Sequence, residues 1–183
     1  MSEIVLKPVG FVRNSITEGS YPAGKPPDPV AEPDKYALWR ERIRQAKQAR
    51  NSVSELVIDD KLDGILDGIE EFSHLLVLYW ADRIPEERRS TLKVHPMGRE
   101  DFPLLGIFAT RSPVRPNPIL ATIVRLLERK GNVLKVQGIE AINGSPILDI
   151  KPQTDDQYDA DQRRIPDWIR EVHQAFDEVE TDE

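Results

Sequence analysis

The feature that most constrains the fold of this chain is a succession of short apolar segments, separated by brief turns, between residues 52 and 152. The segments are too short for ordinary helices and are rich in the β-branched and aromatic residues that strands favour. With an earlier segment at residues 4–13, they predict strands over residues 53–58, 73–80, 91–95, 104–110, 119–127, 133–139 and 146–150. So many short strands predict a mainly β protein, either a small β-barrel or a curled sheet, with peripheral helices.

Local turn signals order some of these strands. Lys130-Gly131-Asn132 joins two β segments, and Asn143-Gly144 is the strongest dipeptide signal for a tight hairpin. Together they predict an antiparallel meander over residues 119–150. The run at residues 74–80 is apolar nearly throughout, which is typical of a strand buried on both faces.

Two helices are expected at the edges of this β region. A helix is predicted over residues 34–50, because apolar residues recur there at spacings of three and four: Tyr36, Trp39, Ile43 and Ala46. A similar stripe predicts a C-terminal helix over residues 163–179. We therefore expect one domain over residues 1–160, with a loop and helix inserted at residues 20–50, followed over residues 161–183 by the helix and an acidic tail.

Proline is over-represented in two places. The chain has 15 prolines, whereas average usage predicts roughly nine. Five fall in residues 20–33, a predicted extended loop, and three brace a loop that carries Arg111, Arg115 and Asn117. Because proline lowers the entropy lost when a loop orders, these polar groups are held ready for a ligand, and arginine suits a carboxylate or phosphate. The alternative interpretation is a rigid barrel corner whose arginines pair with internal acids.

A second polar pair is predicted near the end of the last strand. Asp149 and Lys151 are two residues apart and therefore lie on the same face of that strand. Two roles are open for this pair, which either forms structural ion pairs with Arg111 or Arg115 or orients a ligand.

Several classes of protein are excluded by what the sequence lacks. It has no cysteine, so disulfide frameworks, zinc ribbons and thiol nucleophiles are excluded. Its three histidines lie far apart without metal-ligand spacing, so no metal site is expected. Neither a G-x-G-x-x-G segment nor a P-loop is present, which argues against the commonest nucleotide-binding folds. With no apolar run of about 18–20 residues and no signal peptide, the chain is expected to be cytoplasmic, without membrane contact.

The net charge of −7 is unevenly distributed. Residues 91–135 hold eight bases and three acids, whereas residues 155–183 hold eleven acids and three arginines. A basic middle region is suited to an anionic partner. The plainer interpretation is a solubilising tail beside ordinary solvated strand faces.

One long motif resembles a known family. The segment GIFATRSPVRPNPI at residues 106–119, preceded by Val94-His95-Pro96, resembles the TsaA/YaeB-like family, the TrmO family of tRNA methyltransferases. Further elements are similar in the family's order: VGFVR at residues 9–13, GIEEFSHL at residues 68–75 and NGSPILDIKP at residues 143–152. The resemblance implies a small closed β-barrel that dimerises and binds S-adenosylmethionine without a Rossmann fold. It also implies methylation of N6 of N6-threonylcarbamoyladenosine beside the tRNA anticodon.

The resemblance also implies site residues by position. The expected cofactor contacts are Arg111, Asp82, Arg83, Leu120, Ala121, Gly138, Ile139 and Glu140. Independently of the resemblance, the chemistry of their side chains makes Arg115, Asn117 and Lys151 the expected substrate contacts. The bases Arg99, Arg115, Arg125 and Lys130 are then expected to meet the anticodon arm of tRNA.

The chain also departs from the family pattern. Residues 20–33 and the added helix stand where bacterial members have a P-R-Q triplet, and Asp82-Arg83 replaces a more usual His-Gln pair. Since methyl transfer to an amide-like nitrogen relies on positioning, no covalent nucleophile is expected. Asp149 and His74 are candidates for proton removal, although His74 is interpreted more simply as a core histidine.

Three other functions are consistent with the sequence. The first is a non-catalytic module that binds S-adenosylmethionine or a nucleotide in the same pocket. The second is a methyltransferase that acts on a different small or RNA acceptor. The third is an RNA-binding barrel without a cofactor.

Overall fold

The computed structural model describes residues 3–19 and 26–153. Its strands are β1 (Gly10–Arg13), β2 (Val53–Ile58), β3 (His74–Trp80), β4 (Lys93–Val94), β5 (Leu105–Gly106), β6 (Ile119–Lys130), β7 (Val133–Gln137) and β8 (Pro146–Pro152). An α-helix, α1 (Pro33–Asn51), lies between β1 and β2. Short 3-10 helices occupy four connections: η1 (Ile69–Glu71), η2 (Glu86–Ser90), η3 (Pro96–Gly98) and η4 (Ile107–Ala109). The C-terminal helix predicted at residues 163–179 lies outside the described residues.

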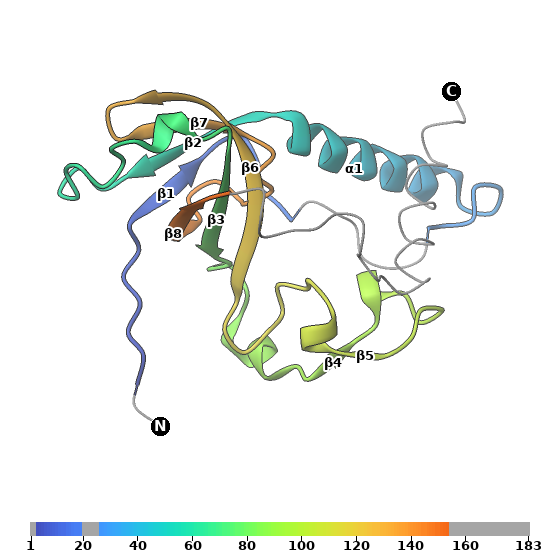
Figure 1. Ribbon diagram of the computed structural model, residues 1–183. Helices are drawn as coiled ribbons and strands as arrows, with labels where there is room; N and C mark the ends of the chain where they lie inside the picture. The colour runs from blue at the N-terminus through green and yellow to red at the C-terminus, as the bar shows by residue number, and fades with distance from the viewer. Residues whose placement is uncertain (1–2, 20–25, 154–183) are drawn as a thin grey trace, which may run out of the picture.

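Six of the strands close into a barrel in the order β1-β2-β7-β6-β3-β8, and each neighbouring pair is antiparallel (Figure 1). The predicted mainly β fold and closed barrel are therefore confirmed. The interior is apolar and includes these fully buried side chains: Val12, Leu56, Leu75, Val77, Leu134, Val136, Ile139 and Ile147. Because the barrel closes on itself, every strand contributes one face to a single core.

That geometry corrects the prediction that residues 74–80 are buried on both faces. Leu75, Val77 and Tyr79 point inward and are buried, whereas the alternate residues Leu76 and Leu78 are only half-buried. Alternation along the strand divides these apolar side chains between the interior and the outer surface of the barrel.

The predicted meander over residues 119–150 is only partly correct. β6 and β7 do form a hairpin, with Gly131 at a φ of 61° in its turn. β8, however, pairs with β1 and β3 rather than with β7. The reason lies at Asn143-Gly144, where Gly144 N–H donates to Val12 O at 2.8 Å and Val12 N–H donates to Ser145 O at 3.0 Å. This turn docks on β1, so residues 138–145 cross the end of the barrel.

Two of the predicted strands are much shorter than expected. Within residues 91–95 and 104–110, only β4 and β5 are extended, and they form a separate two-stranded sheet. Pro96 starts η3, and η4 follows β5 directly, so tight turns replace the expected strand continuations. The predicted first strand is also shorter, since residues 4–9 precede β1.

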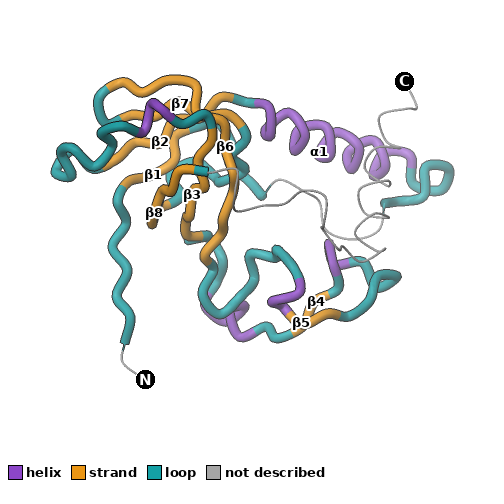
Figure 2. The backbone as a smooth tube through the Cα atoms, viewed as in Figure 1, coloured by secondary structure: helices purple, strands orange, loops and turns teal. Residues whose placement is uncertain are grey.

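The predicted helix at residues 34–50 is confirmed as α1. Its apolar stripe is buried, with Trp39 at 9%, Ile43 at 1% and Ala46 at 2% of full exposure. The helix extends away from the barrel (Figure 2). Its C-terminal end is tied to β7 by a hydrogen bond from Gln137 Nε2 to Asn51 O at 2.9 Å. α1 is therefore a projecting arm attached where β2 begins.

Candidate ligand site at one end of the barrel

Antiparallel pairing brings particular strand ends together. The C-terminal ends of β1, β3 and β7 point in the same direction as the N-terminal ends of β2, β6 and β8. We call this the site end of the barrel, because the predicted cofactor residues gather there. α1 enters β2 at this end, and residues 82–118 connect β3 to β6 across it.

The predicted cofactor residues are spread over three strand ends. Asp82 and Arg83 follow β3, and Leu120 and Ala121 lie near the start of β6, opposite Tyr79 and Leu78 of β3. Gly138, Ile139 and Glu140 follow β7. Gly138 has a φ of 107°, a conformation that glycine adopts most readily, and it begins the segment that crosses the barrel end. The structure therefore gathers residues that are up to about sixty positions apart in the chain.

Arg111 is exposed and anchored to β6. Its Nη2 donates to Ala121 O at 2.6 Å. A guanidinium has five N–H donors, so this bond fixes the side chain and leaves other donors that can meet a ligand. Arg111 is therefore both fixed in position and exposed to solvent near the start of β6.

Tyr79 lies beneath this region and was not predicted as a site residue. Burial raises the pKa of its phenol, the charge of Glu140 acts in the same direction, and a hydrogen bond with Thr122 and the charge of Arg111 oppose the rise. These influences place Arg111 and Glu140, which carry opposite charges, within electrostatic range of one buried hydroxyl. The alternation of buried residues along β3 is the sequence signal that points Tyr79 inward.

We expect Tyr79→Phe to change how stability depends on pH. A raised pKa in the folded state stabilises the fold below the ordinary tyrosine value of about 10, and this contribution is lost as the pH rises through the folded-state pKa. Because the variant lacks the hydrogen bond with Thr122, its free energy of unfolding should be about 1 kcal/mol lower at neutral pH. Between pH 9 and roughly 11, its free energy of unfolding should fall less than that of the unmodified protein. Urea unfolding across this pH range measures both effects. Parallel pH profiles for the two proteins would contradict the assignment.

The loop after β1 is held at the same end by a polar network that the sequence did not reveal. Asn14 Nδ2 donates to Ala141 O at 3.0 Å and to Ser54 Oγ at 3.2 Å, and Asn143 Oδ1 accepts from Asn14 N–H at 3.0 Å. Arg83 adds two bonds, from Nη1 to Thr17 O at 3.1 Å and from Nη2 to Asn143 O at 3.4 Å. Arg83 therefore braces the rim of the site with its guanidinium.

Arg115 also has a bracing role in the structure. Its Nε donates to Ser112 O at 2.9 Å and its Nη2 donates to Thr110 O at 2.8 Å. The predicted rigid corner is thus present, although its arginine holds backbone carbonyls rather than internal acids. Asn117 is exposed, and its carbonyl accepts from Ile119 N–H at 2.7 Å.

Asp149 and Lys151 do not pair with Arg111 or Arg115 as one interpretation had it. They lie opposite Leu78 and Leu76 on the outer face of β8 and bind each other at 2.7 Å. Asp149 is two strands from Ala121 in the same row, which corresponds to about 10 Å. Its second oxygen accepts from Ile150 N–H at 2.9 Å.

The interpretation of His74 as a core histidine is wrong. His74 is exposed at the start of β3, where its Nδ1 lies 2.9 Å from Ser73 Oγ. It pairs with Arg125 on the outward-facing side of the strand, because the inward positions are Leu75 and Val77. It lies five positions before Tyr79, a distance of about 16 Å along an extended strand.

No group of three or more His, Cys, Asp or Glu side chains is arranged to hold a metal ion within residues 3–19 and 26–153. Within those same ranges, no helix has the length and apolar character of a membrane span.

The fold and site define a closed six-stranded β-barrel with a charged cluster at one end. The same class appears among solved structures. The crystal structure of TrmO from Pseudomonas aeruginosa superposes with a TM-score of 0.62 at 24% identity, covering 91% of this chain and 62% of that one. At this identity the likeness supports the barrel fold alone.

The sequence comparisons identify the family. The model of the tRNA-methyltransferase O N-terminal domain matches residues 35–160, and the chain belongs to this family. An S-adenosyl-L-methionine-binding protein of Archaeoglobus fulgidus is 43% identical over 148 residues, which cover 81% of this chain and 88% of the relative. A putative S-adenosylmethionine-dependent methyltransferase of Pseudomonas aeruginosa, RcsF, is 31% identical over 80% of this chain and 55% of its own length. The resemblance inferred from residues 106–119 is thereby confirmed.

Some relatives are considerably longer than this chain. A second Archaeoglobus fulgidus relative, a probable S-adenosyl-L-methionine-binding protein, is 43% identical over 117 residues, but these cover only 30% of its length. The chain therefore spans under a third of that relative and about 62% of the solved TrmO chain.

Proposed function

We propose that this chain binds S-adenosylmethionine at the site end of the barrel and methylates tRNA at N6 of N6-threonylcarbamoyladenosine. The observation that carries the proposal is the placement of Arg111 and Glu140 around the buried Tyr79, beside the half-buried Leu120 and Ala121 of β6. The names of relatives as S-adenosyl-L-methionine-binding proteins, and the family's description as a tRNA methyltransferase, support the same choice of ligand and acceptor.

The charges at the site end fit the head group of this cofactor. An amino-acid head group carries a carboxylate and an ammonium, and a guanidinium and a carboxylate are the complementary side chains. Arg111 would hold the carboxylate, and Glu140 would hold the ammonium or the ribose hydroxyls. Backbone groups of Leu120 and Gly138, at the adjoining strand ends, would line the remaining surface, whereas the predicted contact Ile139 is fully buried in the barrel core. When bound, S-adenosylmethionine supplies an electrophilic methyl group on a positively charged sulfur.

The contribution of the protein to the reaction is positioning. The rate of methyl transfer between a bound donor and a bound acceptor increases most when the acceptor nitrogen is held in line with the methyl group that it attacks. No covalent intermediate with the protein is required. The proline-braced loop around Arg115 fixes the rim on one side, and Arg83 with Asn14 fixes it on the other. Asn117 remains a proposed substrate contact at the site and is exposed to solvent. Lys151 is also exposed, but it lies near the C-terminal end of β8, which points away from the site end, so only an extended substrate would reach it.

Mass spectrometry of tRNA nucleosides tests this proposal. Incubation of the protein with tRNA that carries N6-threonylcarbamoyladenosine and with S-adenosylmethionine should convert that nucleoside to a product heavier by one methylene group. Reactions without cofactor, and with tRNA that lacks the threonylcarbamoyl group, serve as controls. If no nucleoside gains a methyl group under conditions where calorimetry shows cofactor binding, the methyltransferase assignment fails.

A non-catalytic cofactor-binding module is the second candidate. It is favoured by the position of the expected proton acceptors, because His74 is remote from Tyr79 and the Asp149 carboxylate already binds Lys151 and the Ile150 N–H. Binding of S-adenosylmethionine without methylation of any tested RNA would support this function in place of the first.

We also propose a homodimer located in the cytoplasm, where its tRNA acceptor would be found. The outer face of β3 and β6 carries half-buried Leu76 and Leu78 next to Ile123, which is 48% exposed. A second copy that covers this face would remove the apolar side chains from water. Sedimentation velocity measures the mass in solution, and a monomer at micromolar concentration would contradict the dimer.

A further inference from the structure

The bases expected to meet RNA do not lie together in the structure. Lys130 is at the β6–β7 turn, at the opposite end of the barrel from the site. Arg99 binds Asp101 at 2.6 Å and lies over the ring of Phe102 at 4.2 Å. Arg115 donates to carbonyls of its own loop. The basic region at residues 91–135 therefore does not form one surface, and only Arg125 remains exposed near the attachment of α1.

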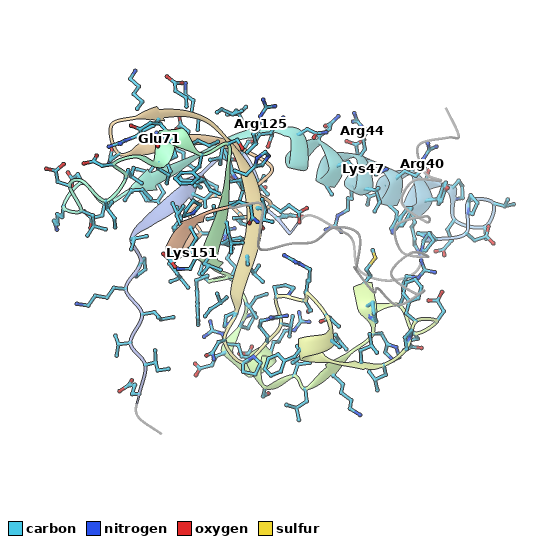
Figure 3. All side chains as sticks on the ribbon, in the orientation of Figure 1. Arg40, Arg44, Lys47, Glu71, Arg125 and Lys151 are labelled. Carbon is cyan, nitrogen blue, oxygen red and sulfur yellow. The ribbon has the colours of Figure 1, made fainter. Side chains whose placement is uncertain are left out.

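Basic residues are concentrated instead on α1, where Lys35, Arg42 and Arg44 pair with Glu32, Glu18 and Glu41. The helix holds six bases and two acids between Pro33 and Asn51. Arg40, Arg44 and Lys47 follow one another at spacings of four and three residues, which places them along one flank of the helix (Figure 3). The axial steps are about 6 Å and 4.5 Å. We call these three residues the cationic stripe.

The cationic stripe starts from the site end of the barrel. α1 leads directly into β2, and Gln137 holds the end of the helix through Asn51. Gln137 is also the register partner of Arg125, so Arg125 continues the positive charge beyond the helix (Figure 3). In Figure 1, α1 and the β4–β5 region lie on the same side of the barrel. A polymer bound along α1 would thus reach the barrel at the row of Arg125 and His74, about 16 Å along the strand from the row of Tyr79.

We propose that the cationic stripe binds the phosphate backbone of the RNA whose base is methylated at the site end. This inference rests on the proposed function, because it assigns a contact surface to that acceptor. Arginine and lysine in a row suit successive phosphates, and arginine can bind a phosphate with two hydrogen bonds. Arg44 binds Glu41 through two N–H donors, Nε to Oε2 at 2.9 Å and Nη2 to Oε1 at 2.8 Å, and Arg40 and Lys47 also have interactions within the chain. Binding of a phosphate therefore requires each base of the cationic stripe to exchange or share a partner.

The burial pattern of α1 favours RNA over a membrane surface. A basic amphipathic helix binds lipid by inserting its apolar face. The apolar face of α1 is already buried, with Ile43 at 1% and Ala46 at 2% exposure. On the charged flank Arg44 is exposed and Arg40 and Lys47 are half-buried, so a partner can reach this flank, and a polyanion is the partner it fits.

The test compares two charge-matched variants. R40Q/R44Q/K47Q removes the cationic stripe, and K7Q/K61Q/K130Q removes three exposed lysines next to the opposite ends of β1, β2 and β6. Glutamine keeps a high helix propensity, so α1 should remain folded, and circular dichroism checks this. Binding of fluorescent tRNA is measured by anisotropy between low and physiological salt, and binding of S-adenosylmethionine is measured by calorimetry.

The stripe variant should bind tRNA at least about tenfold more weakly at low salt. The slope of the logarithm of its tRNA affinity against the logarithm of salt concentration should be smaller in magnitude by about two to three, because fewer phosphates are neutralised. Its affinity for S-adenosylmethionine should be unchanged. The lysine control should bind tRNA almost as well as the unmodified protein. Equal losses in the two variants would show that only net charge matters and would overturn the inference. If the unmodified protein methylates tRNA and the stripe variant does so with the same KM, the inference also fails although the proposed function stands. If the unmodified protein neither binds nor methylates tRNA, the acceptor in the proposed function fails first.

Discussion

Arg111→Ala is expected to weaken binding of S-adenosylmethionine by roughly 10- to 100-fold. A hydrogen bond between a guanidinium and a carboxylate contributes about 1.5–3 kcal/mol, and each 1.4 kcal/mol corresponds to about a tenfold change in affinity. The anchor to Ala121 O fixes the guanidinium before a ligand binds, so little side-chain entropy is lost on binding. Isothermal titration calorimetry measures the change directly.

Two further variants separate binding from folding. Arg88→Ala removes an exposed arginine in η2, from the same connection between β3 and β6, and should leave cofactor affinity unchanged. Arg111→Lys keeps the charge but removes the planar arrangement of donors, so only part of the affinity should return. If Arg111→Ala binds the cofactor as tightly as the unmodified protein, Arg111 is a structural residue that supports β6.

The parts of the fold that were predicted correctly depend on local signals. β2 begins and ends where the apolar run at residues 53–58 does, and the hairpin at Gly131 was expected from its turn residues. α1 follows from the spacing of its apolar residues. In each case the information lies within a few neighbouring residues, so it can be read without knowing the fold.

The errors in the fold arise from contacts between distant segments. Asn143-Gly144 has the composition of a hairpin turn, but its partner is β1, which lies about 130 residues earlier in the chain. No local signal shows that β8 must close the barrel against β1 and β3. For the same reason, the inward and outward faces of β3 cannot be assigned from an apolar run alone.

The residues of the candidate site also divide into those with a local sequence signal and those that depend on contacts between distant segments. Arg111 and Asn117 were found because prolines and arginines are unusual in one short loop. Tyr79 and Asn14 were missed, since their importance depends on pairing with Thr122, Ser54 and Ala141 across the barrel. The family resemblance supplied Glu140 and Ala121, and the barrel explains how these two residues come near Arg111. A site assembled from strand ends becomes visible only once the register is known.

The closure of the barrel that assembles the site depends on one close backbone approach. Gly10 lies at the start of β1 between β2 and β8, opposite Ile58 and Ile147. A Cβ atom at this position would lie 2.2 Å from Val57 O and 2.9 Å from Ile58 Cα. Both neighbours are backbone atoms of β2, so the clash cannot be relieved by rotating a side chain. Space, rather than a special φ, therefore requires glycine at residue 10.

Gly10→Ala should accordingly lower the free energy of unfolding by about 2–3 kcal/mol, since β1 must move away from β2 to admit the methyl group. Gly106→Ala is the matched control, because a Cβ there meets no atom within 4 Å and its φ of −58° is open to any residue. That change should be neutral or slightly stabilising, as it reduces the entropy of the unfolded chain. Urea unfolding measures both free energies. Because β1 also positions Asn14 at the rim of the site, Gly10→Ala should weaken cofactor binding as well. Equal free energies of unfolding for the two variants would show that β1 is not held against β2 at this residue.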